Sequence, residues 1–374
     1  MAKLGSESLT DLSVGAVFLA TGGGGDPHVA QLIAQTALEA HGPVKLLAPE
    51  DLADDAYVVA LGGVGAPTVS LELLPSIHEA ANTLQEFEKR AGRKIDAVVS
   101  FEIGGGNSLI PIVAAAVMGI PVIDGDGMGR ALPEAQMMTY PISGVSPTPA
   151  IATDYRGIVT EFDTTDIMEF ERQIRQCALS SGGMVTSAEH PMTGRQLKDS
   201  IVPGTITFSI ALGRILREHR GNAHRIYEPL SELFAGSIYG DLFHLYTGKV
   251  VDSSTRIVGG YDIGEATIAP FDGAGATLHI SIKNEYLVAQ IDGRTVASVP
   301  DLITIVDYET STPINAERLR YGQRVSVYGI GCPEFYRTTR ALEFVAPRCF
   351  GFEIEYQPIE LLNRDANPAS LART

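Results

Sequence analysis

Short apolar runs alternate with amphipathic stretches across roughly the first 160 residues of the chain. Runs of Val, Ile, Leu and Ala predict five strands, at Val14–Ala20, Val44–Leu47, Tyr57–Leu61, Asp96–Phe101 and Ile120–Ile123. Between them, helical spacing of apolar residues predicts helices at Pro27–Ala40, Ser108–Met118 and Pro133–Met138. A further long helix is predicted to run through Leu71, Leu74, Ile77, Ala81, Leu84 and Phe87. This order of strand, helix and strand is typical of right-handed crossovers, so it predicts an α/β fold with a mostly parallel sheet.

The pattern changes in the second half of the chain. Two helices are predicted at Ile167–Leu179 and Ile206–His219, with Thr205 as the N-cap of the second. Beyond Gly236, β-rich runs bounded by turn residues predict a barrel or sandwich, with strands at Thr277–Ile282, Tyr286–Ile291, Leu302–Val306 and Arg324–Tyr328. We therefore expect an α/β domain over 1–165, a helical connection over 166–235 and a β-rich domain over 236–362.

The composition indicates a globular protein and disfavours several classes of partner. The chain has 374 residues, of which 45% are hydrophobic and 20% charged, so it can bury a sizeable core in two domains. Its net charge of −17 repels phosphate backbones and anionic lipids, so nucleic acids and membrane surfaces are not expected partners. The three thiols, Cys177, Cys332 and Cys349, form no CxxC pair, and no apolar signal segment follows Met1. Both observations favour a cytoplasmic location. We expect a homo-oligomer that acts on a small molecule.

Glycine-rich segments follow several of the predicted strands. They lie at 22–25, 62–65, 104–106 and 125–129, where the carboxyl ends of parallel strands would share one edge of the sheet. A tight turn explains one such segment, but four on one edge favour a binding site in which backbone N–H groups approach a ligand closely. Neither G-x-G-x-x-G nor Gly-Lys-Ser/Thr occurs there, so a nucleotide is not favoured. The predicted ligand contacts are Gly24, Gly25, Gly105 and Asn107.

Carboxylates gather at the same predicted edge: Asp26, Glu72, Glu102, Asp124, Asp126 and Glu134. Close carboxyl groups have their pKa values pushed apart, so that one holds a proton while another acts as a base. Because Glu102 and Asp124 end neighbouring strands, we predict catalytic roles for Glu102, Asp124 and Asp126. Two alternatives stay open: Asp26 and Asp126 cap turns or helices, or Asp26 and His28 bind a divalent metal such as zinc.

Two further side chains in these motifs are candidates for chemistry. Arg130 is the only cation in the glycine-rich segments, and its planar guanidinium suits bidentate binding of a ligand carboxylate. The alternative for Arg130 is an ion pair with Asp126 or Glu134. Cys332 is a candidate nucleophile, but a buried thiol is the simpler interpretation, because no neighbour in the sequence would lower its pKa.

Several longer motifs resemble one family over nearly the whole chain. In the first half they are Thr21-Gly-Gly-Gly-Gly-Asp26-Pro27, Gly65-Ala66-Pro67-Thr68, Glu102-x-Gly104-Gly105-x-Asn107 and Pro121-Val-Ile-Asp124-Gly-Asp126-Gly-Met128-Gly129-Arg130. In the second half they are Asn284-Glu285-Tyr-Leu-Val-Ala289, Val299-Pro300-Asp301-Leu302-Ile303, Arg320-Tyr321-Gly322-Gln323-Arg324-Val325 and Pro347-Arg348-Cys-Phe350-Gly351. Together they resemble the S-methyl-thiohydantoin desulfurase family, formerly a domain of unknown function associated with hydantoinase/oxoprolinase proteins.

The resemblance implies an α/β N-terminal domain, a β-rich C-terminal domain and a bacterial hydrolase. Such an enzyme converts an S-methyl thiohydantoin, or a related hydantoin-like ring, to the hydantoin and methanethiol in the breakdown of thiol-histidine compounds. The alternative function is a ligand-binding or accessory subunit of a hydantoinase/oxoprolinase-type complex. The distal motifs need a reason to lie near a ligand, so we expect Asn284-Glu285 and Pro300-Asp301 at the glycine-rich edge.

Overall fold

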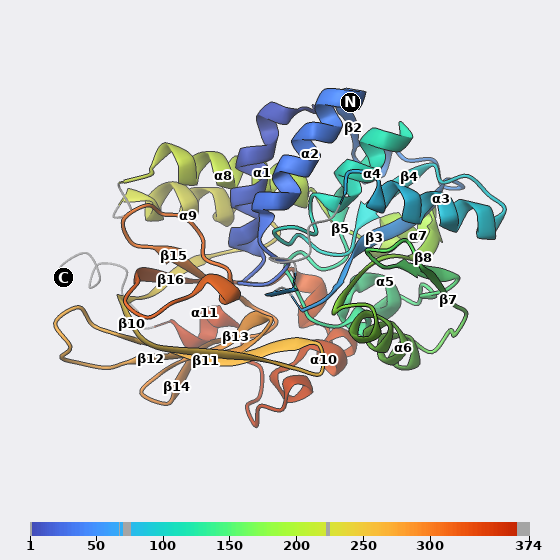
Figure 1. The fold of residues 1–374 in the computed structure, drawn as a ribbon. Coiled ribbons are helices and arrows are strands. Elements are labelled where there is room, and N and C mark those ends of the chain that lie inside the picture. The colour runs from blue at the N-terminus through green and yellow to red at the C-terminus, as the bar shows by residue number, and fades with distance from the viewer. Residues whose placement is uncertain (1, 67, 70–75, 222–224, 365–374) are drawn as a thin grey trace.

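The computed structural model describes residues 2–66, 68–69, 76–221 and 225–364. Two β-sheets dominate it, one in each half of the chain, and helices α1, α2 and α8 lie together beside them (Figure 1). The predicted helix positions Leu71 and Leu74, and the predicted edge carboxylate Glu72, lie outside the described residues.

The first sheet has a parallel centre with antiparallel strands on both sides. Its order is β1 (Ala2–Leu4), β2 (Val44–Leu47), β5 (Val122–Asp126), β4 (Ala97–Ser100), β3 (Tyr57–Gly65), β8 (Met184–Thr193), β6 (Ala150–Thr153) and β7 (Val159–Phe162), with β9 (Val202–Pro203) paired to β5. The pairs β2–β5, β5–β4 and β4–β3 are parallel. This centre confirms the α/β fold class. Strand β8 pairs antiparallel with β3 and comes from the segment expected to be a helical connection.

The helices agree closely with the predicted ones where a 3.6-residue period is clear. They are α1 (Ser6–Leu19), α2 (Pro27–His41), α3 (Glu79–Ala91), α4 (Ile110–Met118), α5 (Thr139–Ile142), α6 (Ile167–Ser180), α7 (Gly194–Ser200), α8 (Thr205–Glu218), α9 (Tyr227–Ala235), α10 (Thr339–Val345) and α11 (Ile359–Leu362). Short 3₁₀ turns include η3 (Ala135–Met137) and η5 (Ala316–Arg318).

The predicted strand at Val14–Ala20 is wrong, because most of this segment forms the end of helix α1. Helix α1 packs between α2 and α8 and is buried on nearly all sides. Gly15 faces the backbone of Ser209, so the two helix axes approach closely. A helix enclosed in this way carries a continuous apolar run, which periodicity cannot distinguish from a buried strand. The first glycine-rich segment therefore follows a helix rather than a strand.

The second sheet is antiparallel throughout and curls on itself. Its order is β14 (Arg294–Ser298), β13 (Glu285–Ile291), β12 (Leu278–Lys283), β11 (Tyr261–Ala269), β10 (Leu242–Val258), β16 (Arg324–Ile330) and β15 (Leu302–Asp307). Strands β13 and β14 also contact β15, which brings the two ends of the sheet together. The β-rich character predicted for this half is confirmed.

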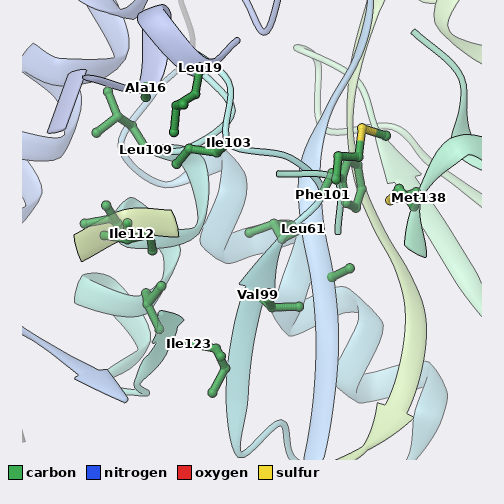
Figure 2. Close-up of a cluster of buried hydrophobic side chains, with 14 of the residues drawn as sticks. Ala16, Leu19, Leu61, Val99, Phe101, Ile103, Leu109, Ile112, Ile123 and Met138 are labelled. Atoms are coloured by element: carbon green, nitrogen blue, oxygen red, sulfur yellow. The ribbon is translucent and has the colours of Figure 1, made fainter. Parts of the chain in front are cut away.

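The main hydrophobic core lies at the parallel strands. Leu61, Val99 and Ile123 come from the neighbouring strands β3, β4 and β5, and Ile112 reaches them from α4 (Figure 2). All four side chains are fully buried. Burying a side chain of this size contributes about 1.5–3 kcal/mol, so the core holds the ends of β3 and β4 in fixed positions.

The two halves of the chain meet at the first glycine-rich segment. The backbone N–H of Tyr286 donates to the carbonyl of Thr21, and the N–H of Ala316 donates to Gly22. The Asn315 amide donates to the carbonyls of Gly23 and Gly25, at 3.2 Å each. The expectation that distal motifs lie at the glycine-rich edge is therefore confirmed.

Arg130 joins these two halves through its guanidinium. Nη1 donates to the carbonyls of Pro300 (2.9 Å) and Asp301 (2.7 Å), Nη2 donates to Thr21 Oγ1 (2.8 Å), and Nε donates to the carbonyl of Ala131 (3.0 Å). The side chain is fully buried. The planar fork thus binds backbone groups on one side and the glycine-rich segment on the other.

We predict that Arg130→Lys lowers the free energy of unfolding by about 2–4 kcal/mol, because an ammonium has too few N–H groups to satisfy all these buried acceptors. Denaturant unfolding of the purified variant measures the change. An unchanged stability together with a raised KM for the substrate would instead assign Arg130 to ligand binding.

Candidate active site

A cavity of about 890 Å³ lies at the carboxyl ends of β3 and β4. Its walls come from the glycine-rich segment 24–26, the end of β3, helices α3 and α4, the segment 153–159 and strand β8. Asn284 and Glu285 close it from the β-rich half. This volume lies within the range of small-molecule sites, so the cavity is the candidate active site.

Glu102 lies in the cavity wall just after β4, and its side chain is buried. Asn107 Nδ2 donates to Glu102 Oε1 at 2.7 Å, and the Leu132 N–H donates to Oε2 at 3.2 Å. Burial is the main cause that raises the pKa of Glu102 to about 7; the two hydrogen bonds and the charge of Arg130 oppose this rise, and the charge of Asp126 adds to it. Near neutral pH this carboxyl group can therefore both accept and return a proton.

Asn107 fixes the orientation of Glu102. Its Oδ1 accepts a hydrogen bond from the backbone N–H of Gly63 at 2.8 Å, while its Nδ2 binds Glu102. The amide therefore links the end of β3 to the loop after β4. A side chain held at both ends keeps the Glu102 carboxyl in a single orientation.

Glu285 is another buried carboxyl group in the cavity wall. It is the first residue of β13 and follows Asn284, whose φ of 58° turns the chain and whose Oδ1 accepts from the N–H of Asp262. The Glu285 carboxyl packs against Gly23, where any side chain would overlap it. Oε2 has no hydrogen-bond partner among the described residues. Burial, followed by the charge of Glu102, raises the pKa of Glu285 well above its usual range.

Glu102 and Glu285 therefore lie in different environments. Glu102 has hydrogen-bond donors on both oxygens, which stabilise the carboxylate, whereas Glu285 has an unpartnered oxygen, which favours the protonated acid. Sequence reasoning placed the Asn284-Glu285 motif at this edge but assigned Glu285 no chemical role. The signal was available in the sequence: an acid that directly follows a turn-forming Asn and begins the mainly apolar run Glu285-Tyr-Leu-Val-Ala289.

The other two predicted catalytic acids lie outside the set of described residues that line the cavity. Asp124 is at the N-terminus of α8, where its Oδ1 accepts from the N–H groups of Ile206 and Thr207. We expected Thr205 to cap this helix. Instead, Asp124 supplies the acceptor for the first N–H groups, and it comes from the neighbouring strand β5. Asp126 accepts from the N–H groups of Met128 and Gly129, and burial raises its pKa to about 6.

Like the predicted catalytic acids, the predicted ligand contacts fall into two groups, those that line the cavity and those that do not. Gly24, Gly25 and Asn107 line the cavity, whereas Gly105 and Arg130 lie outside the described residues that line it. The glycine-rich segments pack directly on each other: the Gly106 N–H donates to the carbonyl of Gly24 at 2.8 Å. Close packing of two loops is thus one reason for these glycines, in addition to access for a ligand.

Asp26, one of the two donors proposed for a metal, has other partners. Asp26 caps α2 by accepting from the His28 N–H, and its Oδ2 binds Arg318 at 2.6 Å. The His28 side chain is exposed. Across the described residues, no group of three His, Cys, Asp or Glu side chains is arranged to hold a metal ion. Asp26 and His28 do not fit a metal site, and no step below depends on one.

Cys332 is fully enclosed rather than presented to the cavity. Its Sγ lies 3.8 Å from the Tyr356 hydroxyl, and its N–H donates to Asp301 at 2.9 Å. Burial raises the pKa of the thiol, which disfavours the nucleophilic thiolate. The interpretation as a buried thiol therefore agrees with the geometry.

The expected partners and location of the protein are tested in one respect, which is whether a helix could span a membrane. None of the helices within the described ranges is both long enough and apolar enough to cross a membrane. The homo-oligomer and the cytoplasmic location stay predictions.

We predict that Asn107→Ala raises the Glu102 pKa above about 7, because the mutation removes a hydrogen bond that stabilises the carboxylate. A hydrogen bond to a charged group contributes about 1.5–3 kcal/mol, which corresponds to roughly one to two pKa units. Carboxyl ¹³C NMR titration measures this shift, with Glu102→Gln identifying the signal. Asn82→Ala, on the α3 wall of the cavity, is the matched control and should leave the signal unchanged. An unshifted Glu102 titration in Asn107→Ala would contradict the assigned role of Asn107.

Comparison with known proteins identifies the family. The S-Me-THD-like N-terminal domain matches residues 7–164, and the S-Me-THD-like C-terminal domain matches residues 164–359. An X-ray crystal structure of a protein from Chromobacterium violaceum shares the fold, with a TM-score of 0.80 and 22% sequence identity over 96% of this chain and 100% of that chain. No curated protein matches the chain. The chain therefore belongs to the S-Me-THD-like family, in agreement with its glycine-rich and distal motifs.

Proposed function

We propose that this protein hydrolyses an S-methyl thiohydantoin, or a related hydantoin-like ring, to the hydantoin and methanethiol. The observation that carries the proposal is the pair of buried carboxyl groups, Glu102 and Glu285, in one cavity of an S-Me-THD-like chain. Glu285 acts as the proton donor to the ring, and Glu102 acts first as the base for water and then as the acid for the leaving sulfur.

In the first step, water adds to the ring carbon that carries the methylthio group. Protonated Glu285 gives its proton to the ring nitrogen doubly bonded to that carbon, which makes the carbon electrophilic. The Glu102 carboxylate takes a proton from water as the water oxygen bonds to the carbon. The product of this step is a neutral tetrahedral carbon bearing a hydroxyl and the methylthio group, with Glu285 ionised and Glu102 protonated.

In the second step, the carbon–sulfur bond breaks. Its electron pair goes to sulfur, and Glu102 returns its proton to form methanethiol. The hydroxyl on carbon gives its proton to Glu285 as the carbonyl of the hydantoin forms. Both carboxyl groups regain their starting states, and the net reaction consumes one water molecule for each thiol released.

The charge distribution in the cavity favours a ring that becomes cationic. The cations among its described lining residues are each paired with an acid: Arg156 with Asp154 at 2.7 Å, Arg175 with Glu171 at 2.9 Å, and Lys89 with Glu86 at 2.5 Å. Glu102 and Glu285 have no such cationic partner within hydrogen-bond reach in the described part of the chain. Protonation of the ring therefore adds positive charge beside carboxyl groups, which lowers the free energy of the step.

The direct test is an assay of the purified protein with an S-methyl thiohydantoin. We expect one thiol, detected with a thiol-reactive chromophore, for each hydantoin detected by chromatography. Glu102→Gln and Glu285→Gln should each lower kcat by about 10²–10⁴-fold, the usual contribution of a general acid or base. Binding without thiol release would support the accessory-subunit alternative, and full activity of Glu102→Gln would reject the assigned mechanism.

A pH profile tests the two protonation states separately. Because Glu102 must be ionised to accept a proton, kcat/KM should rise with pH through about 7, the Glu102 pKa. It should fall again at higher pH, because Glu285 must keep its proton and its pKa is raised. Glu102→Gln should remove the acid limb from any residual activity. An acid limb centred near the ordinary glutamate pKa of about 4.3 would contradict the role of Glu102.

A further inference from the structure

We propose that the Glu189 carboxylate accepts a hydrogen bond from a ring N–H group of the substrate, and that it thereby excludes rings alkylated at that nitrogen. The inference rests on the proposed function and adds to it a residue that binds the ring and determines specificity. Glu189 lies in strand β8, lines the cavity and is 1% exposed. The reaction proposed above does not use it.

Glu189 differs from most other acids of the cavity wall in its partners. Asp154 and Glu171, which are buried like Glu189, each bind an arginine and a backbone N–H group. Three half-buried acids of the wall each bind a lysine or an arginine: Asp26, Glu86 and Glu134. Among the described lining residues, the buried acids without a lysine or arginine partner are Glu102, Glu285 and Glu189. The first two transfer protons in the proposed reaction, which leaves Glu189 without a role.

The Glu189 carboxylate has unused capacity to accept hydrogen bonds. Its Oε2 accepts from the Ser187 hydroxyl at 2.5 Å, which is its one side-chain or backbone donor in the described part of the chain. Its Oε1 lies 3.3 Å from His190 Nδ1, but neither imidazole nitrogen makes a hydrogen bond to a described residue. A carboxylate has about four acceptor sites, and a buried charge that is incompletely paired is costly. A donor on a ligand in the cavity would fill this capacity.

The backbone of β8 is distorted next to Glu189. The register of β8 against β3 shifts just beyond the pair that Glu189 forms with Ala60, so that β8 has two residues where β3 has one. His190 lies within this bulge with a φ of 50°, and its N–H donates to the carbonyl of Pro147. A bulge changes the direction of neighbouring side chains and is common beside active sites, where residues with a positive φ also concentrate. The distortion therefore agrees with a role for Glu189 in binding.

Glu189 faces the same side of the sheet as Phe101, the residue before Glu102. Residues two apart in a strand share a face, and so do residues paired across antiparallel strands. Ala60, which pairs with Glu189, therefore shares its face with Gly62, and a methyl group on Gly62 would lie 2.4 Å from the Phe101 ring. Phe101, Glu102 and Glu189 all line the cavity. A planar ring packed on Phe101 is thus the position in which both acids are used.

The chemistry of the substrate supplies the donor. The carbon that carries the methylthio group lies between two ring nitrogens, one doubly bonded to it and the other bearing hydrogen. When Glu285 protonates the first nitrogen, the positive charge spreads over both N–H groups. A carboxylate bound to the second N–H then makes a charge-assisted hydrogen bond, which is stronger than a neutral one. Glu189 therefore holds the ring more tightly as the carbon becomes electrophilic.

The test compares an S-methyl thiohydantoin with its analogues methylated at either ring nitrogen. In the wild-type protein we expect kcat/KM for one of the two analogues to fall roughly 100-fold or more, because methylation removes the donor and leaves a buried carboxylate unpaired. In Glu189→Ala, the ratio of kcat/KM for the unmethylated ring over this analogue should fall on the order of tenfold or more, because no acceptor is left to distinguish them.

Glu189→Gln separates hydrogen bonding from shape. Glutamine fills nearly the same space and keeps an acceptor for Ser187, but it carries no charge, and hydrogen bonds to neutral groups are weaker. We expect the same ratio to fall about tenfold in Glu189→Gln. If the wall merely excluded a methyl group by its shape, Glu189→Gln would keep the wild-type ratio, and that result would overturn the proposal.

Glu79→Gln is the matched control. Glu79 also lines the cavity and also accepts from a hydroxyl group of β8, that of Thr186 at 3.0 Å, but it lies in α3 and is half-buried. We expect the ratio between the two rings to stay within about twofold of the wild-type value, because the ring contacts are untouched. Thermal unfolding of each variant checks that it is folded.

The outcomes separate the role of Glu189 from the reaction itself. Thiol release with a ratio that does not change in either Glu189 variant would overturn the proposal and leave the proposed function intact. An absence of thiol release from every compound would overturn the proposed function. In that case calorimetry with hydantoin, 1-methylhydantoin and 3-methylhydantoin tests Glu189 by binding alone. A weaker Kd for one methylhydantoin that disappears in Glu189→Ala would support the role, and any other result would reject it.

Discussion

The contact between the β-rich half and the segment from Thr21 to Gly25 is the constraint on which the rest of the site depends. Backbone carbonyls of this segment accept hydrogen bonds from Tyr286, Ala316 and Asn315. Arg130 binds Thr21 on one side and backbone carbonyls of Pro300 and Asp301 on the other. These bonds are buried, and a buried polar group left unpaired is costly. The two halves therefore hold one relative position.

This fixed position explains the unusual environment of Glu285. The same backbone contact that pairs Tyr286 with Thr21 inserts the preceding carboxyl group beside Gly23. Removed from water and close to Glu102, the carboxyl group is more stable with its proton. The raised pKa of Glu285 thus arises from the packing of the two halves rather than from a dedicated hydrogen-bond partner. Glu102, by contrast, owes its environment to neighbours in its own half, Asn107 and Leu132.

The glycines allow close packing in this arrangement. Gly24 and Gly104 approach each other so closely that a side chain on Gly24 would overlap the Gly104 backbone. This packing gives the cavity a wall made of main chain. Gly63 is also tightly packed, because a side chain there would lie 3.0 Å from Met184 Cε and 3.3 Å from Asn107 Oδ1. Both positions concern how the fold around the cavity is assembled.

The sequence by itself determined the fold class, five of the helices, about half of the strands, the family and the edge at which the candidate site lies. Local signals were sufficient for these features: alternating apolar runs, the 3.6-residue period and glycines after strands. It also identified Glu102, which directly follows a buried strand. Only the tertiary structure decided that Val14–Ala20 belongs mostly to a helix, because α8 encloses it. It likewise directed Asp124 to the α8 N-terminus and brought Glu285 to the cavity. Each of these outcomes depends on a partner far away in the chain, and the pairing of distant segments leaves no periodic signal in the sequence.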